Sequence, residues 1–324
     1  MESANVIDRL APVFKQVDQQ IRDQIGSDVP FVSQVSEYIL LSGGKRLRPT
    51  LFVLAARLCG YNGGREYYFS SMFEYLHAAT LLHDDVVDQA DTRRGQKAAH
   101  LVYGNQGVIL VGDFLFAKSM ALAAETEQLK IGEFLADTVA RMAEGEILQL
   151  LHAWDVEITE AEYERVIHRK TGALIEAACH LGAILAGAPQ DWADRLGSYG
   201  RMIGHAFQII DDALDYSTTA AEFGKPVGHD LDEGKITLPI IRTLREAHAA
   251  DRAELLELVT KKRRSDEEFE RVKALIDQYD GLSQSRDRAI QLVDEAKANL
   301  EALPDRPEKA DLADLADFII VRRN

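Results

Sequence analysis

The stretch LLHDDVVDQADTRRG, residues 81–95, places three closely spaced aspartates and two arginines at the end of an apolar helical segment. At about 3.6 residues per turn, Asp84 and Asp88 share one face of the predicted helix 66–89, with Asp85 beside them. Carboxylates four residues apart repel each other, and an apolar environment makes their charge costly unless a cation neutralises it. The stretch therefore predicts a helical protein with either a solvated acidic patch or a cation site.

A second segment, FQIIDDALDY at residues 207–216, repeats this arrangement. Asp211 and Asp215 are again four residues apart, Asp212 lies beside them, and Gln208 is one turn before Asp212 on nearly the same face. One such cluster is weak evidence, because acidic surface helices are common. Two clusters in apolar helices indicate a site for hard divalent cations such as Mg²⁺, which usually also bind substrate phosphates.

Cationic residues recur beside both acidic clusters, although the formal net charge of the chain is −16. That charge disfavours nucleic acid or an anionic membrane as a bulk partner. Arginine forks bind phosphate oxygens in pairs, and glycine-bearing turns let the backbone approach an anion. The pattern predicts a diphosphate held partly through metal ions and partly through direct cationic contacts. These cationic residues are Lys45, Arg46, Arg48, Arg93, Arg94, Lys170, Lys225 and Lys235.

Helix-compatible spacing covers nearly all of the chain. With 324 residues, 46% of them hydrophobic, and only 8 prolines, the chain can bury a large core and favours helices over sheet. We find no alternating strand pattern with hairpin turns, so we predict an all-α fold in a single domain, residues 1–324. The predicted helices span residues 5–25, 30–41, 48–60, 66–89, 106–124, 130–151, 160–168, 171–187, 191–216, 235–248, 252–261, 266–279, 282–302 and 308–322.

Cysteine usage and hydropathy bear on the compartment. Cys59 and Cys179 form no disulfide framework, fit a reducing environment and are expected to be buried thiols. The chain opens without a signal-peptide pattern, and no uncharged apolar run reaches the roughly 18 residues of a membrane span. We therefore predict a cytoplasmic protein without a membrane span.

Six motifs, in this order along the chain, resemble those of the trans-isoprenyl diphosphate synthases. No one of them would suffice, but together they make a chance match very improbable over about residues 38–240. The resemblance implies a large helical bundle of the isoprenoid synthase type around a central substrate cavity. The motifs are GGKRLRP (43–49), LLHDDVVDQADTRRG (81–95), GDFLFAKS (112–119), KTGALIEAA (170–178), FQIIDDALDY (207–216) and GKPVGHDLDEGKITLP (224–239).

The resemblance also implies roles for individual residues. Isopentenyl diphosphate is expected at Lys45, Arg48, His77 and Arg94. The allylic diphosphate is expected at Arg93, Lys170, Lys225 and Lys235, with Thr171 and Gln208 along the path of the developing cation. About two to three Mg²⁺ ions, or Mn²⁺ in their place, are expected at Asp84, Asp85, Asp88, Asp211, Asp212 and Asp215. The residues expected to act in catalysis are Asp84, Asp85, Asp88, Arg93, Lys170, Asp211, Asp212 and Lys225.

The implied reaction is a head-to-tail condensation. The metal ions turn the allylic diphosphate into a leaving group, and the cationic side chains stabilise the charge that develops on it. The double bond of isopentenyl diphosphate then attacks the allylic cation, and a proton is lost, most simply to the released diphosphate. Residues 224–234 are the expected lid that excludes water from the cation.

Residues before the first acidic cluster bear on product length. Thr80 and Ala79 lie one turn before it, and Leu76 and Tyr75 two turns before it. Short-chain members of the family carry a bulky aromatic residue in the first turn, whereas both residues here are small. We therefore expect a hexaprenyl to nonaprenyl product, most simply octaprenyl, made from farnesyl diphosphate for quinone side chains. A geranylgeranyl or shorter product remains the alternative because of Leu76 and Tyr75.

Other protein classes share parts of this pattern. A class I terpene cyclase has the fold and the aspartates but does not need the isopentenyl diphosphate pocket, and a non-catalytic subunit of a heteromeric synthase typically lacks one acidic cluster. The sequence His83-Asp84-Asp85 also resembles a phosphohydrolase motif, without further histidines at matching spacings. The resemblance further implies a homodimer, and a hydrophobic product implies transient contact with a membrane at release.

Overall fold

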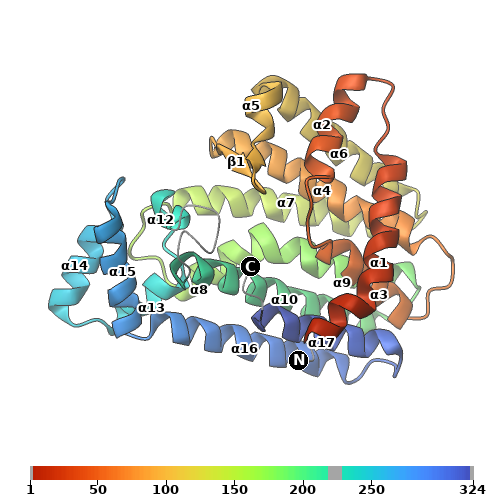
Figure 1. Ribbon diagram of the computed structural model, residues 1–324. Coiled ribbons are helices and arrows are strands. Elements are labelled where there is room, and N and C mark those ends of the chain that lie inside the picture. Colours follow the sequence, from red (N-terminus) through yellow and green to blue (C-terminus); the bar gives the residue numbers. More distant parts are fainter. Residues whose placement is uncertain (1–2, 218–227, 322–324) are drawn as a thin grey trace. The chain divides into compact units, whose positions relative to one another are not determined.

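The structure is a computed structural model of the chain, and it describes residues 3–217 and 228–321 (Figure 1). The chain divides into two compact units. The first unit comprises Met1–Thr138, Ala177–Gly197 and Ala302–Leu312, and the second comprises Val139–Glu176, Ser198–Glu301 and Ala313–Asn324. The prediction of a single domain over residues 1–324 stays a prediction.

The fold is all-α, as the sequence predicts. The helices within the first unit are α1 Ser3–Gln24, α2 Pro30–Leu40, α3 Leu47–Leu58, α4 Glu66–Val87, α5 Ala99–Tyr103 and α6 Asn105–Ala124. Those within the second are α8 Glu160–Ile167, the π-helix η1 His168–Gly172, α12 His229–Asp232, α13 Leu238–Glu246, α14 Ala249–Val259, α15 Asp266–Gln278 and α16 Gly281–Leu300. The helices with residues in both are α7 Leu129–Leu151, α9 Ala173–Leu185, α10 Gln190–Ser217 and α17 Pro307–Val321.

In the first unit, helix α4 carries the first acidic cluster and lies alongside α6 (Figure 1). Apolar side chains such as Met72 and Phe73 are fully buried, which accounts for the long apolar run before the aspartates. Gly112 of α6 allows the close approach of the two helices, because a Cβ there would lie 2.3 Å from Nε2 of His83. The glycine of the GDFLFAKS motif therefore has a packing role at the aspartate-bearing end of α4.

A short antiparallel hairpin, β1 Thr92–Arg93 and β2 Gln96–Lys97, was not expected from the sequence. Its two-residue turn has φ 51° at Arg94 and 75° at Gly95. Turns with two residues at positive φ match the twist of a hairpin and favour glycine. Strands of two residues are too short to produce an alternating pattern, which is why the pattern analysis missed them.

In the second unit, α10 carries the second acidic cluster, and α13 packs beside α16. The sequence analysis ended one helix at residue 168 and began another at 171, whereas the chain continues through η1 without a break. A π-helical turn absorbs one extra residue without ending the helix, which accounts for this continuity.

Two further sequence predictions concern burial and membranes. Cys179 is buried as predicted, but Cys59, at the C-terminal end of α3, is only half-buried. Among the described residues, one helix, α6, is long and apolar enough to cross a membrane by length and composition. This is weak evidence, because the core helix of a soluble protein passes the same test, and no membrane span is shown.

Candidate active site

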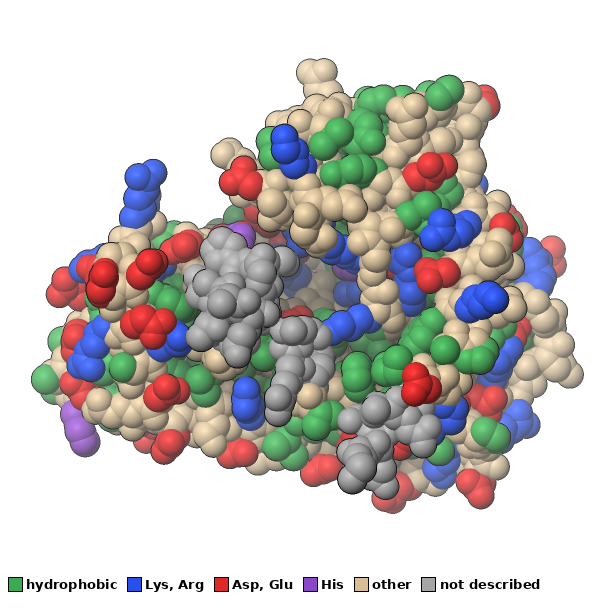
Figure 2. All heavy atoms as spheres, viewed as in Figure 1, with side chains coloured by type: hydrophobic (Ala, Val, Ile, Leu, Met, Phe, Trp, Pro, Cys, Tyr) green, Lys and Arg blue, Asp and Glu red, His purple; other side chains and the backbone are tan. Residues whose placement is uncertain are grey.

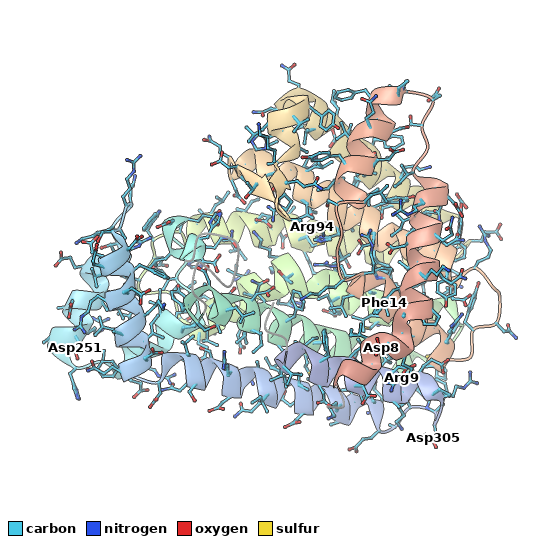
Figure 3. All side chains as sticks on the ribbon, in the orientation of Figure 1. Asp8, Arg9, Phe14, Arg94, Asp251 and Asp305 are labelled. Carbon is cyan, nitrogen blue, oxygen red and sulfur yellow. The ribbon has the colours of Figure 1, made fainter. Side chains whose placement is uncertain are left out.

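The turn before α3 carries two of the residues expected to bind isopentenyl diphosphate, Lys45 and Arg48. Gly43 and Gly44 have backbone φ angles of 97° and 144°, which residues other than glycine rarely adopt. The Arg94 guanidinium packs on this turn, where it donates to the carbonyl of Gly43 and, at 3.3 Å, to Oγ of Ser42 (Figure 3). A Cβ on Gly44 would lie 3.2 Å from Nη2 of Arg94. The glycine pair therefore brings Arg94 next to the turn that carries Lys45.

Arg46 does not have the anion-binding role that its position in this turn suggested. Its side chain is only 6% exposed and donates to Glu74 and Asp18, each at 2.7 Å, and to the carbonyl of Leu40 at 2.6 Å. Burial lowers the pKa of Arg46, but Glu74 and Asp18 raise it more, so the guanidinium stays charged. Arg46 thus anchors the turn through a buried ion pair, which is strongly destabilising to break.

His77, on α4, lies in a strongly electropositive environment. Burial lowers its pKa well below the ordinary value, and the positive charges of Arg48 and Arg94 lower it further. The imidazole is therefore neutral at pH 7 and leaves the surrounding arginines to supply the charge. A half-buried neutral histidine among arginines fits the predicted anion site.

The first acidic cluster contains one fully buried carboxylate. Arg93 donates through Nε to Oδ1 of Asp85 at 2.8 Å and also through Nη2, while Oδ2 of Asp85 is buried without a hydrogen-bond partner. Asp84 is half-buried, and Asp88 is exposed at the C-terminal end of α4. A buried carboxylate oxygen without a donor is costly, so this oxygen fits a bound cation.

In the second unit, Lys170 and Thr171 lie on the π-helix η1. Lys170 donates to Oε2 of Glu146 at 2.9 Å, and Thr171 donates through Oγ1 to Oε1 of Gln208 at 2.8 Å. Two glycines make room for the turn. A Cβ on Gly145 would lie 2.6 Å from the amide nitrogen of Lys170, and one on Gly204 would lie 2.6 Å from Cα of Gly172.

The second acidic cluster is held by protein donors. Asp212 is 4% exposed and accepts from Tyr163 at 2.6 Å and Gln208 at 2.7 Å. Asp215 accepts from the backbone N–H groups of Gly228 at 3.2 Å and Asp230 at 3.1 Å. Burial raises the pKa of Asp212 to about 8 and of Asp215 to about 6, and the Asp230 carboxylate adds to both shifts.

A cavity of about 90 Å³ lies beside this cluster within the second unit. Lys235, the other described lysine expected on the allylic diphosphate, pairs with Asp230 at 3.3 Å and with Glu233. Burial lowers the pKa of Lys235, but Asp230 and Glu233 raise it more, so the ammonium is retained. The cavity is lined by predicted site residues and by others, including Lys170, Thr171, Gln208, Asp212, Tyr163 and Lys235.

The fit of both clusters to magnesium rests on their donor chemistry. Among the described residues, no three acidic, histidine or cysteine side chains are arranged as a complete metal site. Mg²⁺ usually binds one or two carboxylates and completes its shell with water and substrate phosphate oxygens, so incomplete carboxylate sets of this kind suit it. Lys225 and residues 224–227 of the expected lid lie outside the described residues.

Comparison with known proteins identifies the family. The family model of the polyprenyl synthetases matches residues 29–276. The chain belongs to the polyprenyl synthetase family. It is 40% identical over 323 residues to the octaprenyl diphosphate synthase of Haemophilus influenzae, a match that covers 99% of this chain and 98% of that protein.

Two solved structures of polyprenyl synthetases are also similar. The decaprenyl diphosphate synthase of Rhodobacter capsulatus has a TM-score of 0.91 and 41% identity, with 98% of each chain covered. A polyprenyl synthase of Caulobacter crescentus, complexed with calcium and isoprenyl diphosphate, has a TM-score of 0.92 and 37% identity, with 99% of this chain and 98% of that chain covered. This chain is therefore a prenyltransferase of isoprenoid synthesis from a Mg²⁺-dependent family, and its relatives support a long all-trans product.

Several residues of this polyprenyl synthetase were not singled out by sequence reasoning. Tyr163 has no signal in the sequence, because a tyrosine four residues into a helix is unremarkable. Asp230 was visible within the motif at 224–239 but was not assigned a role. Glu146, which is not among the predicted site residues, is an ion-pair partner of Lys170.

The raised pKa of Asp212 predicts a pH dependence of the metal-free enzyme. Above about pH 7.5, His77, His168 and His205, whose pKa values are lowered by burial, are almost entirely neutral whether the chain is folded or unfolded, because an unfolded histidine titrates near about 6.5. From about pH 7.5 upward the folded state still keeps part of a proton on Asp212, whose pKa is about 8, that the unfolded state has lost. The free energy of unfolding should therefore fall as pH rises, by at most about 1.4 kcal/mol per pH unit.

Urea unfolding in the presence of a chelator, from about pH 7.5 to 8.5, measures this slope. The Asp212→Asn variant, which cannot titrate at this position, should show a flatter dependence. An equal slope in the variant would show that another group is responsible.

Proposed function

We propose that this enzyme condenses isopentenyl diphosphate with farnesyl diphosphate to make an all-trans octaprenyl diphosphate for quinone side chains, within a range from hexaprenyl to nonaprenyl. The observation that carries the long-chain product is the small size of Ala79 and Thr80, the two residues that lie one turn before Asp84 and Asp85. Ala79 is buried, and Thr80 donates to the carbonyl of His77 at 2.9 Å, so neither places a bulky group there.

In this proposal, Lys45, Arg48, His77 and Arg94 bind isopentenyl diphosphate. Arg94 already lies on the glycine turn and His77 is neutral, so the anion meets preorganised positive charge that needs little rearrangement. Arg46 stabilises the turn but does not touch the substrate, because its donors are taken up by Glu74, Asp18 and Leu40.

The allylic diphosphate is bound by Arg93, Lys170, Lys225 and Lys235, together with the two acidic clusters. Magnesium, when bound, neutralises the diphosphate and makes it a leaving group. Lys170 and Lys235 exchange their carboxylate partners, Glu146 and Asp230, for phosphate oxygens and stabilise the departing charge. About two to three metal ions per active site are expected on Asp84, Asp85, Asp88, Asp211, Asp212 and Asp215.

The allylic carbon becomes positively charged as the diphosphate leaves. Oxygen atoms of Thr171 and Gln208 line the same cavity as Lys170 and stabilise this charge. The double bond of isopentenyl diphosphate forms the new carbon–carbon bond, and the resulting cation loses a proton to the released diphosphate. Each cycle adds one isoprene unit, and the chain extends past Ala79 toward Leu76 and Tyr75.

The proposal predicts a magnesium-dependent ladder of products. Purified protein, labelled isopentenyl diphosphate, farnesyl diphosphate and Mg²⁺ should give products that end near octaprenyl, sized by chromatography. The Asp84→Ala variant should lose at least about a hundredfold in rate, because a predicted metal ligand is removed. Incorporation by no allylic primer would favour a non-catalytic subunit, and a stop at geranylgeranyl would keep the chemistry but overturn the long-chain proposal.

Substitutions on α4 should change the product length. Ala79→Phe places a ring in the first turn and should shorten the product toward farnesyl or geranylgeranyl. Tyr75→Ala, two turns before the cluster, should lengthen the product, because Tyr75 is buried and removal of its ring leaves space for a longer chain. Val87→Ala, at an exposed position on the same helix, serves as the control, and an unchanged ladder in Ala79→Phe would contradict the proposed path.

We also propose that the enzyme is a cytoplasmic homodimer that touches a membrane only to release its product. In the first unit, α5 and α6 expose Leu101, Val102, Ile109 and Leu110, the last at 67%, and Figure 2 shows hydrophobic side chains grouped over neighbouring α2. Exposed aliphatic residues concentrated on adjacent helices are typical of a protein interface, and a second copy would cover them.

Leu110→Glu should convert the dimer to a monomer, because a charge in the centre of an apolar interface is costly to bury. Sedimentation analysis measures the mass of the particle. Ile290→Glu, at an isolated exposed position on α16, is the matched control and should leave the mass unchanged. A wild-type monomer, or a dimer that survives Leu110→Glu, would contradict this interface.

A further inference from the structure

Asp212 is the acceptor at the centre of a chain of hydrogen bonds in the second unit. Tyr163 donates to Oδ2 at 2.6 Å, Gln208 donates through Nε2 to Oδ1 at 2.7 Å, and Thr171 donates to Oε1 of Gln208 at 2.8 Å. Tyr163 and Asp212 are both only 4% exposed. All four side chains line the cavity that contains Lys170 and Lys235.

The Gln208 amide sets the direction of these hydrogen bonds. Its NH₂ group donates to Asp212, so its oxygen faces Thr171 and accepts from it. The Thr171 hydroxyl then donates its only proton to Gln208. Its oxygen lone pairs are left for another partner, and hydrogen bonds in such a chain polarise and strengthen one another.

Tyr163 occupies its place through local and tertiary structure together. Thr159 caps α8 with a full capping box, since it accepts from the N–H of Glu162 at 3.2 Å and the Glu162 carboxylate accepts from the N–H of Thr159 at 2.8 Å. Tyr163 follows directly, and α8 continues through η1 to Thr171. One continuous helical segment therefore carries both ends of the hydrogen-bonded chain.

We propose that Tyr163 is a positioning residue. Its hydroxyl holds the Asp212 carboxylate in one orientation and, through it, orients Gln208 and Thr171 so that oxygen lone pairs face the allylic carbon as its positive charge develops. This inference rests on the proposed function and assigns a role to a residue that neither binds a diphosphate nor reacts.

The test uses Tyr163→Phe in the full-length enzyme, which removes one oxygen and keeps the buried ring. We expect kcat with farnesyl diphosphate to fall about 10- to 100-fold, as for other partners of metal-binding carboxylates, and KM for isopentenyl diphosphate to stay within about twofold. A purely structural role would affect both. An unchanged kcat, or a KM that rises in proportion, would overturn the proposal.

The matched control is Tyr279→Phe. Tyr279 also donates to an aspartate at 2.6 Å, Asp251 of α14, which Figure 3 labels. Tyr279 directly follows α15, and neither residue lines the cavity. Losing this bond should leave kcat and KM unchanged. A loss of kcat equal to that of Tyr163→Phe would mean that removing any tyrosine–aspartate bond has the same effect, and the proposal would fail.

A double-variant comparison tests whether Tyr163 acts through Asp212. The double variant Tyr163→Phe/Asp212→Asn should have the kcat of Asp212→Asn alone, because the residue that Tyr163 positions is already altered. It also leaves no buried carboxylate without a donor, so it remains informative if Tyr163→Phe alone does not fold. Additive losses would show that Tyr163 acts by another route.

A binding measurement separates this inference from the proposed function. Mg²⁺ with inorganic diphosphate should raise the melting temperature of the wild type and of Tyr279→Phe more than that of Tyr163→Phe. The reason is that Asp212 is less well oriented in the Tyr163→Phe variant. A wild type that makes no prenyl product refutes the proposed function only. An active wild type whose Tyr163→Phe variant shows the full shift in melting temperature and full kcat refutes the positioning role only.

Discussion

Buried carboxylates impose the main physical constraint on this enzyme, because an ionised group removed from water needs donors or cations around it. Asp85 receives two donors from Arg93 and keeps one buried oxygen without a partner. Asp212 accepts hydrogen bonds from Tyr163 and Gln208, and burial raises its pKa to about 8. The two acidic clusters thus meet the same requirement differently, one with an arginine and the other with neutral donors.

Glycines determine how closely the anion-binding groups can approach. At Gly44, the Arg94 guanidinium occupies the space that a side chain would fill, and at Gly145 the backbone of Lys170 does so. In both places the absence of Cβ positions a cationic residue rather than making the chain flexible. Each of these two glycines is therefore explained by a close contact that can be named.

Neighbouring cationic residues have different roles because their burial differs. Lys45, Arg46 and Arg48 are adjacent in one motif, and composition alone does not separate them. Arg46 adopts a left-handed backbone conformation with φ 47°, turns into the first unit and is held there by Glu74 and Asp18. A buried guanidinium with three protein acceptors has little capacity left for a substrate.

The sequence by itself determined the long helices, the two acidic clusters and the family, because helical periodicity and i, i+4 spacing are local properties, whereas the short helices α5 and α12 were not predicted. The tertiary structure alone decided the partners of those residues. Tyr163 and Asp212 are 49 residues apart, and Arg46 and Glu74 are 28 apart, so no spacing rule connects them. The hairpin at 92–97 and the π-helix at 168–172 were likewise missed, since each is a short departure from regular geometry whose stability depends on packing with distant segments.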